Sequence, residues 1–324
     1  MSEGSLRRSV LITGAGGYLG TETLKALAAI RNQFSSIVAT DVREISENQR
    51  LSGVTYVVLD VRDERIESVL RDHAIDTVVH LASIVTPRKN ANREFEYTVD
   101  VLGTRNVIER CLRAGVNHLI VTSSGAAYGY YADNPIPLSE DDRIRGNPEF
   151  AYSDHKRLVE EMLAEYRATH PELRQLIFRP GTILGENTAN QITNLFERRW
   201  ILGLTGSPSP FVFIWDHDVV ACIVQGILEQ KSGIYNLAGD GTMTMLEIAR
   251  LLGKPYIELP PVGLAFCLRL LKALGLTQYG PEQVNFLRYR PVLSNERLKT
   301  EFAYTPQKTS REAFETYARG KGLL

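Results

Sequence analysis

The chain has 324 residues, of which 44% are hydrophobic and 23% are charged, and its formal net charge is −1. This length is enough for one large α/β domain and a smaller lobe that caps a substrate. The near-zero charge creates no broad electrostatic field that would point to nucleic acid or to an anionic membrane as a partner.

Three cysteines, Cys111, Cys222 and Cys267, lie far apart in the chain. Their odd number indicates a reducing compartment, and their spacing matches no zinc site. We therefore expect a cytoplasmic protein without a bound metal.

The polar segment 1–8 lacks the apolar core of a signal peptide. The most apolar later stretch, 262–275, is too short to span a bilayer and contains Arg269 and Lys272, so we expect no integral membrane segment. We expect this stretch to pack on the protein's own core, with a surface amphipathic helix as the alternative.

In the first half of the chain, short β-rich runs alternate with helical patterns. This alternation predicts an α/β fold with a parallel sheet and crossover helices. Several runs are nearly continuously apolar, which is typical of strands covered by helices on both faces. The predicted strands span residues 9–13, 36–40, 55–59, 77–81, 118–122 and 175–178, and the predicted helices span residues 19–30, 64–72, 93–114 and 152–169.

The pattern becomes looser from about residue 181. We expect residues 1–180 to form the large domain and residues 181–324 to form mainly a small C-terminal lobe, with some segments returning to the sheet. Thr244, followed three residues later by Glu247, predicts a capping box at the start of a helix. The elements predicted here are a loop at 203–210, strands at 211–214 and 235–237, helices at 219–229 and 245–252, and a helical tail at 293–320.

A glycine-rich turn follows the first predicted strand, with Gly14, Gly17 and Gly20 at GxxGxxG spacing. Gly14 permits a tight turn, Gly17 lets the backbone approach a phosphate, and Gly20 allows close packing of helix on strand. The helix that starts near Leu19 directs free N–H groups and its positive dipole end at that phosphate. The order strand, turn, helix predicts a dinucleotide site that includes Tyr18.

Asp41 follows the second predicted strand, 21 residues after Gly20. A carboxylate at this place accepts hydrogen bonds from an adenosine ribose with a free 2′-hydroxyl and repels a 2′-phosphate, so NAD is favoured over NADP. Arg43 is the opposing signal, because an arginine nearby could meet that phosphate; it could equally be solvated or stack beside adenine. Val42 is expected in the same part of the site.

Tyr152 and Lys156 are four residues apart on a predicted helix and therefore share one face. An ammonium group near a phenol favours the phenolate, so we expect Lys156 to lower the pKa of Tyr152 and to make it an acid or base near neutral pH. The segment 121–129 carries Ser123 and Ser124 ahead of this pair. Strand-end capping could account for both serines; the segment resembles the serine-bearing segment of a known enzyme family, and alignment on its Tyr-Gly end implies that Ser124 is the hydroxyl that acts with Tyr152.

In this order, the glycine motif, the serine-bearing segment and the Tyr-x-x-x-Lys pair resemble the extended short-chain dehydrogenase/reductase family, which includes the NAD-dependent epimerases and dehydratases. The resemblance covers residues 10–238. It implies a Rossmann-like, doubly wound parallel sheet with a C-terminal substrate-binding lobe, and hydride transfer between NAD and a substrate carbon. It also implies that Ser124 holds the substrate oxygen, Tyr152 takes or gives the proton, and Lys156 bonds the nicotinamide ribose.

The same resemblance implies further cofactor contacts. Asp60 and Val61, after the third strand, correspond to a step that lies against the adenine, and the segment that begins at His80 lines the cofactor. We expect His80 itself to be structural. Beyond the glycine turn and residues 41–43, the residues expected at the cofactor are Asp60, Val61, Leu81, Ala82, Ser83, Thr122, Tyr152, Lys156 and Pro180.

Three positions depart from the family pattern. Asp100 stands where an asparagine usually organises the site; it could do so with altered charge or serve another role nearby. Gly125 and Ala126 stand where sugar dehydratases place an Asp-Glu pair that eliminates water, so dehydration is disfavoured. Phe211 stands where nucleotide-sugar enzymes have an arginine for the diphosphate. The candidates to replace it, each of which could equally be a surface charge, are Arg198, Arg199, Arg288 and Arg290.

Three further segments carry weaker expectations. Residues 216–218, Asp-His-Asp, could suggest a metal site, but the family equivalent is structural and we expect no metal. Residues 191–200 are expected either to line the substrate pocket or to pack in the core. Relatives commonly dimerise through two long helices, here 93–114 and 152–169, so we expect a homodimer.

These features predict an NAD-dependent oxidoreductase that acts on a secondary alcohol carbon of a small-molecule substrate, as a nucleotide-sugar 4-epimerase. In that chemistry NAD accepts hydride, the ketone rotates, and hydride returns to the other face. The first alternative is an NAD(P)-dependent dehydrogenase or ketoreductase of a less charged, hydroxysteroid-like substrate, which Phe211 and the apolar stretch 262–271 support. The second is a regulator that senses NAD without catalysis, against which the intact Ser124, Tyr152 and Lys156 argue.

Overall fold

The largest element of the protein is a seven-stranded sheet in which all neighbouring strands run parallel, in the order β10-β6-β5-β4-β1-β2-β3. The structure is a computed structural model that describes residues 7–85, 92–277 and 280–324, so most of the polar segment 1–8 lies outside the described residues. The order of strand addition reverses between β1 and β4, which is where such sheets bind ligands. The strands are β1 (Arg8–Thr13), β2 (Phe34–Asp41), β3 (Thr55–Val58), β4 (Thr77–His80), β5 (His118–Thr122), β6 (Arg174–Pro180) and β10 (Gly233–Leu237).

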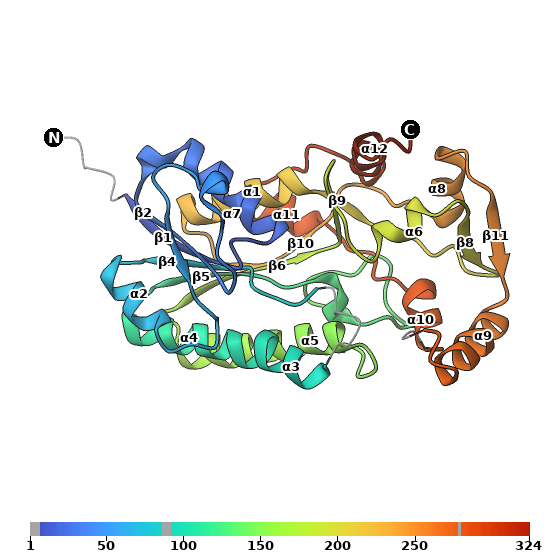
Figure 1. Ribbon diagram of the computed structural model, residues 1–324, viewed down its shortest axis with the longest axis horizontal. Helices are drawn as coiled ribbons and strands as arrows, with labels where there is room; N and C mark the ends of the chain where they lie inside the picture. The colour runs from blue at the N-terminus through green and yellow to red at the C-terminus, as the bar shows by residue number, and fades with distance from the viewer. Residues whose placement is uncertain (1–6, 86–91, 278–279) are drawn as a thin grey trace.

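Helices cover both faces of this sheet (Figure 1). Val10 and Ile12 of β1 pack into the core on one face, and Leu11 between them packs into the core on the other. Successive strand residues point to opposite faces, so this burial explains the continuous apolar runs and confirms the doubly wound α/β fold. The first face carries α1 (Tyr18–Ala29) and α7 (Asp216–Glu229), and the second carries α2 (Ile66–Asp72), α4 (Gly103–Ala114) and α5 (Ala151–Thr169).

The predicted helix 93–114 contains a π-helical turn. It begins as α3 (Arg93–Tyr97), continues as the π segment η3 (Thr98–Leu102), and becomes α4. A π turn is rare within an α-helix and occurs frequently at functional sites. Asp100, one of the three departures from the family pattern, lies in this turn.

The small lobe lies at one end of the large sheet (Figure 1). Two parallel strand pairs, β7 with β9 and β8 with β11, and several short helices surround a core rich in aromatic side chains. β10 and α7 follow residue 180 in the chain, yet β10 belongs to the large sheet and α7 packs on it. A domain boundary at residue 180 therefore separates β6 from its neighbour β10 within one sheet. The remaining elements are β7 (Thr182–Leu184), β8 (Ile201–Leu204), β9 (Phe213–Trp215), β11 (Tyr256–Leu259), α6 (Thr193–Glu197), α8 (Met245–Leu251), α9 (Pro261–Ala273), α10 (Gln283–Arg288), α11 (Glu296–Thr300), α12 (Ser310–Gly320) and the short turns η1 (Arg31–Gln33), η2 (Glu47–Gln49) and η4 (Gly125–Tyr128).

Several predicted boundaries in this half are wrong. β8 occupies the first residues of the predicted loop 203–210, and α7 begins at Asp216, since acidic residues are favourable in the first turn of a helix. The tail forms two helices, α11 and α12, and Pro306 lies in the segment between them, where it could not donate a helical hydrogen bond. The capping box of Thr244 and Glu247 is confirmed at the start of α8.

The apolar stretch 262–275 forms α9, and the expectation that it packs on the core is wrong. No side chain of α9 is buried, so the surface-helix alternative holds. Apolar spacing shows that a helix has a face to cover, whereas only the tertiary structure shows whether a neighbour covers it. Across the described ranges, no helix combines the length and apolar character needed to cross a membrane.

Candidate active site

The glycine-rich turn lies at the carboxyl end of β1, at the switch point of the sheet. Gly14 has a φ of +66°, and a Cβ there would lie 2.7 Å from the backbone nitrogen of Ala82. A Cβ on Gly20 would lie only 2.3 Å from the carbonyl oxygen of Gly14. The turn is therefore packed too tightly for side chains at these two positions, and it leaves the N-terminus of α1 open for a phosphate. Leu81 and Ala82, two residues expected at the cofactor, lie directly against this turn.

Asp41 ends β2 and is buried beside the turn. Its carboxylate accepts hydrogen bonds from the backbone N–H of Gly16 at 3.0 Å and of Arg43 at 3.0 Å. The Arg43 guanidinium is mostly exposed and lies 3.6 Å from the same carboxylate. The structure thus fixes the Asp41 carboxylate beside the glycine turn and leaves the Arg43 side chain exposed, next to the exposed Val42.

Tyr18 connects the turn to the other half of the chain. Its hydroxyl donates to Asp216 at 2.5 Å and accepts from Thr188 at 3.1 Å. Burial, followed by the hydrogen bond to Asp216, raises the pKa of this phenol. The second acid of the Asp-His-Asp segment, Asp218, accepts from the Tyr304 hydroxyl and from the backbone of Gln307. Asp216 therefore joins the start of α7 to Tyr18 of α1, and Asp218 joins α7 to the segment before α12.

His80 is buried at the end of β4. Its Nδ1 lies 2.7 Å from the Thr13 hydroxyl, and its Nε2 lies 2.9 Å from the Thr104 hydroxyl. Because Thr104 already donates to the carbonyl of Asp100, it accepts from Nε2–H, which leaves Nδ1 to accept from Thr13. Burial lowers the pKa of His80 to about 3, so the ring is neutral and ties β1, β4 and α4 together. This is the structural role expected for it.

Asp60 and Val61 follow β3. Arg62 donates to both carboxylate oxygens of Asp60, at 2.9 and 2.6 Å, and this hydrogen bonding lowers the pKa of Asp60. Val61 is buried against α4, where a Cβ on Gly103 would come within 2.7 Å of its side chain. Val61 therefore packs against α4, on the second face of the sheet. Both residues follow β3, where the resemblance leads us to expect the adenine.

Ser124 and Tyr152 face each other across the carboxyl edge of the sheet. Ser124 follows β5 and Tyr152 lies in the first turn of α5, and Ser124 is close enough to Tyr152 to favour its phenolate. Burial raises the pKa of Tyr152 to about 12; Ser124 opposes this shift and the charge of Asp100 adds to it. Ser123, the rejected serine, donates instead to the buried Glu160 at 2.5 Å.

The expectation that Lys156 lowers the pKa of Tyr152 is wrong in this structure. The Lys156 ammonium donates to the carbonyl of Thr122 at 3.0 Å and lies 5.6 Å from the centre of the Tyr152 ring. Burial lowers the pKa of Lys156 itself, while the charges of Asp100 and Glu160 raise it. Both groups have lost water, which disfavours the phenolate of Tyr152 and the ammonium of Lys156.

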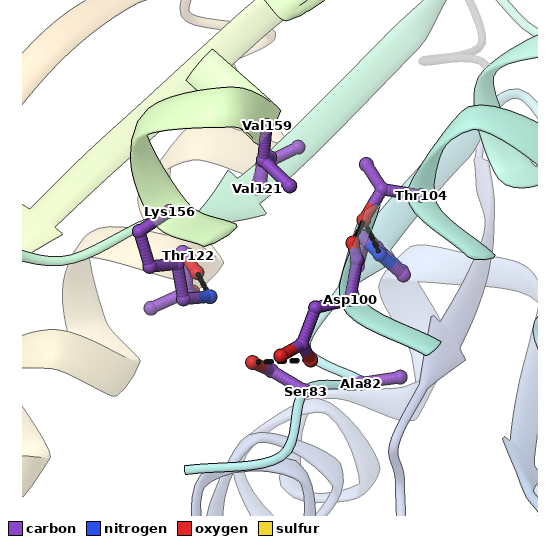
Figure 2. A pocket seen from close by; sticks show the side chains of 9 residues that line it. Ala82, Ser83, Asp100, Thr104, Val121, Thr122, Lys156 and Val159 are labelled. Atoms are coloured by element: carbon purple, nitrogen blue, oxygen red, sulfur yellow. Dashed lines mark hydrogen bonds between the residues drawn. The ribbon is translucent and has the colours of Figure 1, made fainter. Parts of the chain in front are cut away.

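A small pocket lies where β4 and β5 end, next to Lys156 (Figure 2). Thr122 has a buried hydroxyl oxygen without a hydrogen-bond partner among the described residues. Pro180, at the end of β6, lies along the same sheet edge. The pocket is lined by His80, Ala82, Ser83, Asp100, Thr104, Val121, Thr122, Lys156 and Val159.

Asp100 organises this pocket. Its carboxylate accepts from the hydroxyl of Ser83 at 3.1 Å, as Figure 2 shows, and from the backbone N–H of Ile84 at 2.8 Å. Its other oxygen lies 3.1 Å from Nδ1 of the buried His155. Asp100 thus holds the segment after β4 in place, and it brings a negative charge near Tyr152 and Lys156.

A buried network beneath the serines was not predicted. Arg179 donates to both carboxylate oxygens of Glu160 at 2.6–2.9 Å and to the Tyr128 hydroxyl at 2.8 Å. Glu160 lies one turn beyond Lys156 on the same face of α5, which is the only signal that the sequence offered. A buried ion pair of this geometry fixes the backbone that carries Ser123 and Ser124.

Phe211 is buried in the aromatic core of the small lobe, and its ring supports an arginine. The Arg290 guanidinium lies 4.0 Å from the centre of the Phe211 ring and 4.8 Å from that of Phe286. One of its nitrogens donates to Thr182 at 3.3 Å, and the other is buried without a hydrogen-bond partner among the described residues. Of the four arginines considered, Arg290 is therefore the one held between two aromatic rings, those of Phe211 and Phe286.

Residues 191–200 contribute to the core through Phe196, which packs edge-on against Phe211 and Phe213. Trp200, at the end of this segment, is exposed. Phe196 therefore follows the second of the two expectations for this segment, which was packing in the core.

A glycine turn at the switch point of a parallel sheet, with Ser124, Tyr152 and Lys156 on the same edge, is typical of dinucleotide-dependent oxidoreductases. The family model described as NAD dependent epimerase/dehydratase family matches residues 10–238. The chain belongs to this family, and it is an NAD-dependent enzyme of the extended short-chain dehydrogenase/reductase type.

Two relatives show how far sequence similarity extends. An uncharacterised protein of Mycobacterium bovis is 24% identical over 318 residues, which cover 97% of this chain and 84% of that protein. A UDP-glucose 4-epimerase of Azospirillum brasilense is 31% identical over 188 residues, which cover 56% of this chain and 51% of that protein. The chain thus matches about half the length of the epimerase.

Solved structures share the fold across the whole chain. A UDP-glucose 4-epimerase of Thermotoga maritima, solved with UDP-glucose, has a TM-score of 0.74 at 16% identity and covers 97% of this chain and 98% of that one. A dTDP-glucose 4,6-dehydratase of Bacillus anthracis, solved with NAD, has a TM-score of 0.73 at 16% identity, covering 97% and 96%. These similarities confirm the Rossmann-like architecture.

Proposed function

We propose that this enzyme oxidises and re-reduces a secondary alcohol carbon of a nucleotide sugar, as a 4-epimerase. The observation that carries the proposal is the placement of Ser124 and Lys156 beside Tyr152, on the sheet edge that also holds the glycine turn. Relatives named UDP-glucose 4-epimerase support the choice of substrate class.

The residues present fit NAD. The turn at Gly14 and Gly20 has no room for side chains and exposes the N-terminus of α1 to a pyrophosphate. Asp41 would hold the adenosine ribose, and Lys156 with the unpartnered hydroxyl of Thr122 would hold the nicotinamide ribose. When bound, NAD supplies a nicotinamide ring that accepts and returns hydride.

The protein's own part in the reaction is to hold and move one proton. Ser124 positions the substrate oxygen, and Tyr152 takes the hydroxyl proton as the carbon is oxidised and returns it on reduction. Because the pKa of Tyr152 is raised, the phenol is protonated at neutral pH in this structure, and it becomes a base only when positive charge approaches it. Lys156 is the nearby group that can supply this charge once it turns from the carbonyl of Thr122.

Arg290 would anchor the substrate's phosphate. One of its nitrogens has no hydrogen-bond partner within the described part of the chain, and Phe211 and Phe286 support the guanidinium, so Arg290 is a cationic group available to an anion. The pKa of the nearby Tyr130 phenol is raised to about 12 by burial, is lowered by the Arg290 charge and is raised by Tyr152. Tyr130 therefore lies within electrostatic reach of both the catalytic tyrosine and the proposed anion anchor.

A second candidate function is a dehydrogenase or ketoreductase of a less charged alcohol. The cluster of Tyr130, Phe150 and Phe286, whose ring centres lie 4.8–5.8 Å apart, favours this function because it offers apolar surface beside the catalytic edge. Dehydration remains disfavoured, since Gly125 and Ala126 can supply neither an acid nor a base.

The two functions separate in one experiment. Purified enzyme is incubated with UDP-galactose, and product is followed by NMR together with absorbance at the wavelength of reduced nicotinamide. Epimerisation predicts UDP-glucose without lasting absorbance, and the Tyr152→Phe variant should lose about two to four orders of magnitude in rate. Lasting absorbance without the isomer would favour the dehydrogenase. Neither product, or full activity of Tyr152→Phe, would refute the epimerase proposal.

A further inference from the structure

Helix α9 presents an uncovered apolar face. The exposed fractions are 82% for Val262, 65% for Phe266, 51% for Leu270 and 62% for Leu274. These residues recur every four positions, so they form one stripe along the helix. Leu276, just beyond the helix, is 71% exposed and extends the apolar surface.

The opposite side of α9 is partly covered, so the helix is attached to the lobe rather than detached from it. Leu264 and Leu268 are half-buried on that side. α9 contacts α10, and it follows β11 directly at the end of the small lobe that lies away from the large sheet (Figure 1). The exposed stripe therefore points outward from a fixed position.

The dimensions of the stripe argue against a stable protein partner. A helix of 13 residues is about 20 Å long and about 10 Å wide, so it offers a footprint of roughly 200 Å². A stable dimer buries roughly 800 Å² on each partner. An interfacial helix on a bilayer needs no such area, because apolar side chains enter the headgroup–acyl boundary one by one.

The charges near the stripe suit an anionic surface. Arg269 and Lys272 are the charged residues of α9, and the nearest charged residues on either side along the chain are Glu258 and Glu282. Both are exposed, and Lys272 lies 3.2 Å from Glu282. The net charge of the whole chain is −1, so any attraction to a membrane must be local.

We propose that α9 docks on the surface of a bilayer that contains anionic phospholipid, with the Val262–Leu274 stripe inserted and Arg269 at the headgroups. A single short helix of this kind gives reversible binding. α10, which contacts α9, carries Phe286 of the substrate-side aromatic cluster, so docking places the substrate side of the lobe at the membrane. The docking requires none of the catalytic residues.

The test is co-sedimentation of the full chain with vesicles of phosphatidylcholine alone or mixed with phosphatidylglycerol. We expect binding to the mixed vesicles that weakens with salt, and about tenfold or greater loss of binding in the Phe266→Ser/Leu270→Ser variant. The matched control is Val58→Ser/Ile136→Ser, which removes two exposed apolar side chains from other parts of the chain and should bind as the wild type does. Arg269→Glu should weaken binding to the mixed vesicles alone.

Absence of wild-type binding, or equal binding by the Phe266→Ser/Leu270→Ser variant, would overturn the proposal. Oligomers that dissociate in this variant, with no vesicle binding, would show instead that a second copy covers α9. Circular dichroism and NAD titration of each variant separate lost docking from lost folding. Failure of docking would leave the proposed oxidoreductase function untouched.

Discussion

The pKa of Tyr152 is set by the balance between burial and nearby charge, and this pKa decides when the residue can act as a base. Burial raises the pKa of the phenol to about 12, because this effect outweighs the opposing influence of Ser124. The negative charge of Asp100 raises the pKa further. Spacing predicted the Tyr152–Lys156 pair and the family resemblance predicted Ser124, but neither carries information on desolvation. The direction of the pKa shift, like the Glu160–Arg179 pair, depends on neighbours from distant segments and was therefore not predictable.

Asp100→Asn should shift the acidic limb of the pH–rate profile for alcohol oxidation to lower pH. Removing the negative charge lowers the pKa of Tyr152, so more phenolate is present at a given pH. Asparagine is isosteric, and its oxygen can still accept from Ser83 and Ile84. Asp133→Asn, at an exposed residue paired with Arg145, is the control and should leave the profile unchanged. A shift to higher pH in Asp100→Asn would contradict this electrostatic role.

Arg290→Met should raise the KM for a nucleotide sugar about tenfold to a hundredfold, since a charge-assisted hydrogen bond contributes about 1.5–3 kcal/mol. The expected effect on kcat is small because the phosphate lies away from the reacting carbon. Arg288→Met is the matched control, because Arg288 stacks on Tyr289 rather than on the Phe211 side. Steady-state kinetics of both variants measure the difference, and equal KM values would remove Arg290 from the substrate site.

Among the elements, those of the large sheet were predicted to within a few residues, whereas in the small lobe only β9 and α8 with its capping box were. Central strands are apolar on both faces and end at turns, so a short stretch of sequence is enough to recognise them. The π turn at Thr98–Leu102 and the exposure of α9 depend on packing between segments that the sequence pattern does not connect. The resemblance likewise supplied the position of Phe211, but its support of Arg290 required the tertiary structure.

Gly20→Ala should lower the free energy of unfolding by about 1–3 kcal/mol, because the added methyl group overlaps the carbonyl of Gly14 at 2.3 Å. Gly263→Ala is the control at another helical glycine, whose Cβ would meet only Pro260 at 4.0 Å. It should stabilise the protein by about 0.5–1 kcal/mol, as alanine does within a helix. Urea unfolding compares the two, and a neutral Gly20→Ala variant would contradict the close packing of α1 on the turn.

On the scale of the whole molecule, the catalytic edge lies between a rigid sheet and a lobe that carries the proposed substrate contacts. We expect a homodimer through the α3–α4 stretch and α5, which lie side by side on one face of the sheet (Figure 1). Leu102 and Phe95 are exposed on the first of these, and a partner would cover them. Analytical ultracentrifugation at micromolar concentration should show twice the chain mass, with Leu102→Glu shifting the protein to a monomer. A monomeric wild type would contradict this prediction.

The proposed epimerase requires a bound nicotinamide cofactor. Freshly purified protein is denatured, released nicotinamide nucleotides are identified by chromatography, and any empty fraction is titrated with NAD. We expect near-stoichiometric NAD, retained through a cycle in which the cofactor does not leave and selected by Asp41. NADP in the site would show that Arg43 outweighs Asp41, and a protein that neither contains nor binds a nicotinamide nucleotide would contradict the central claim.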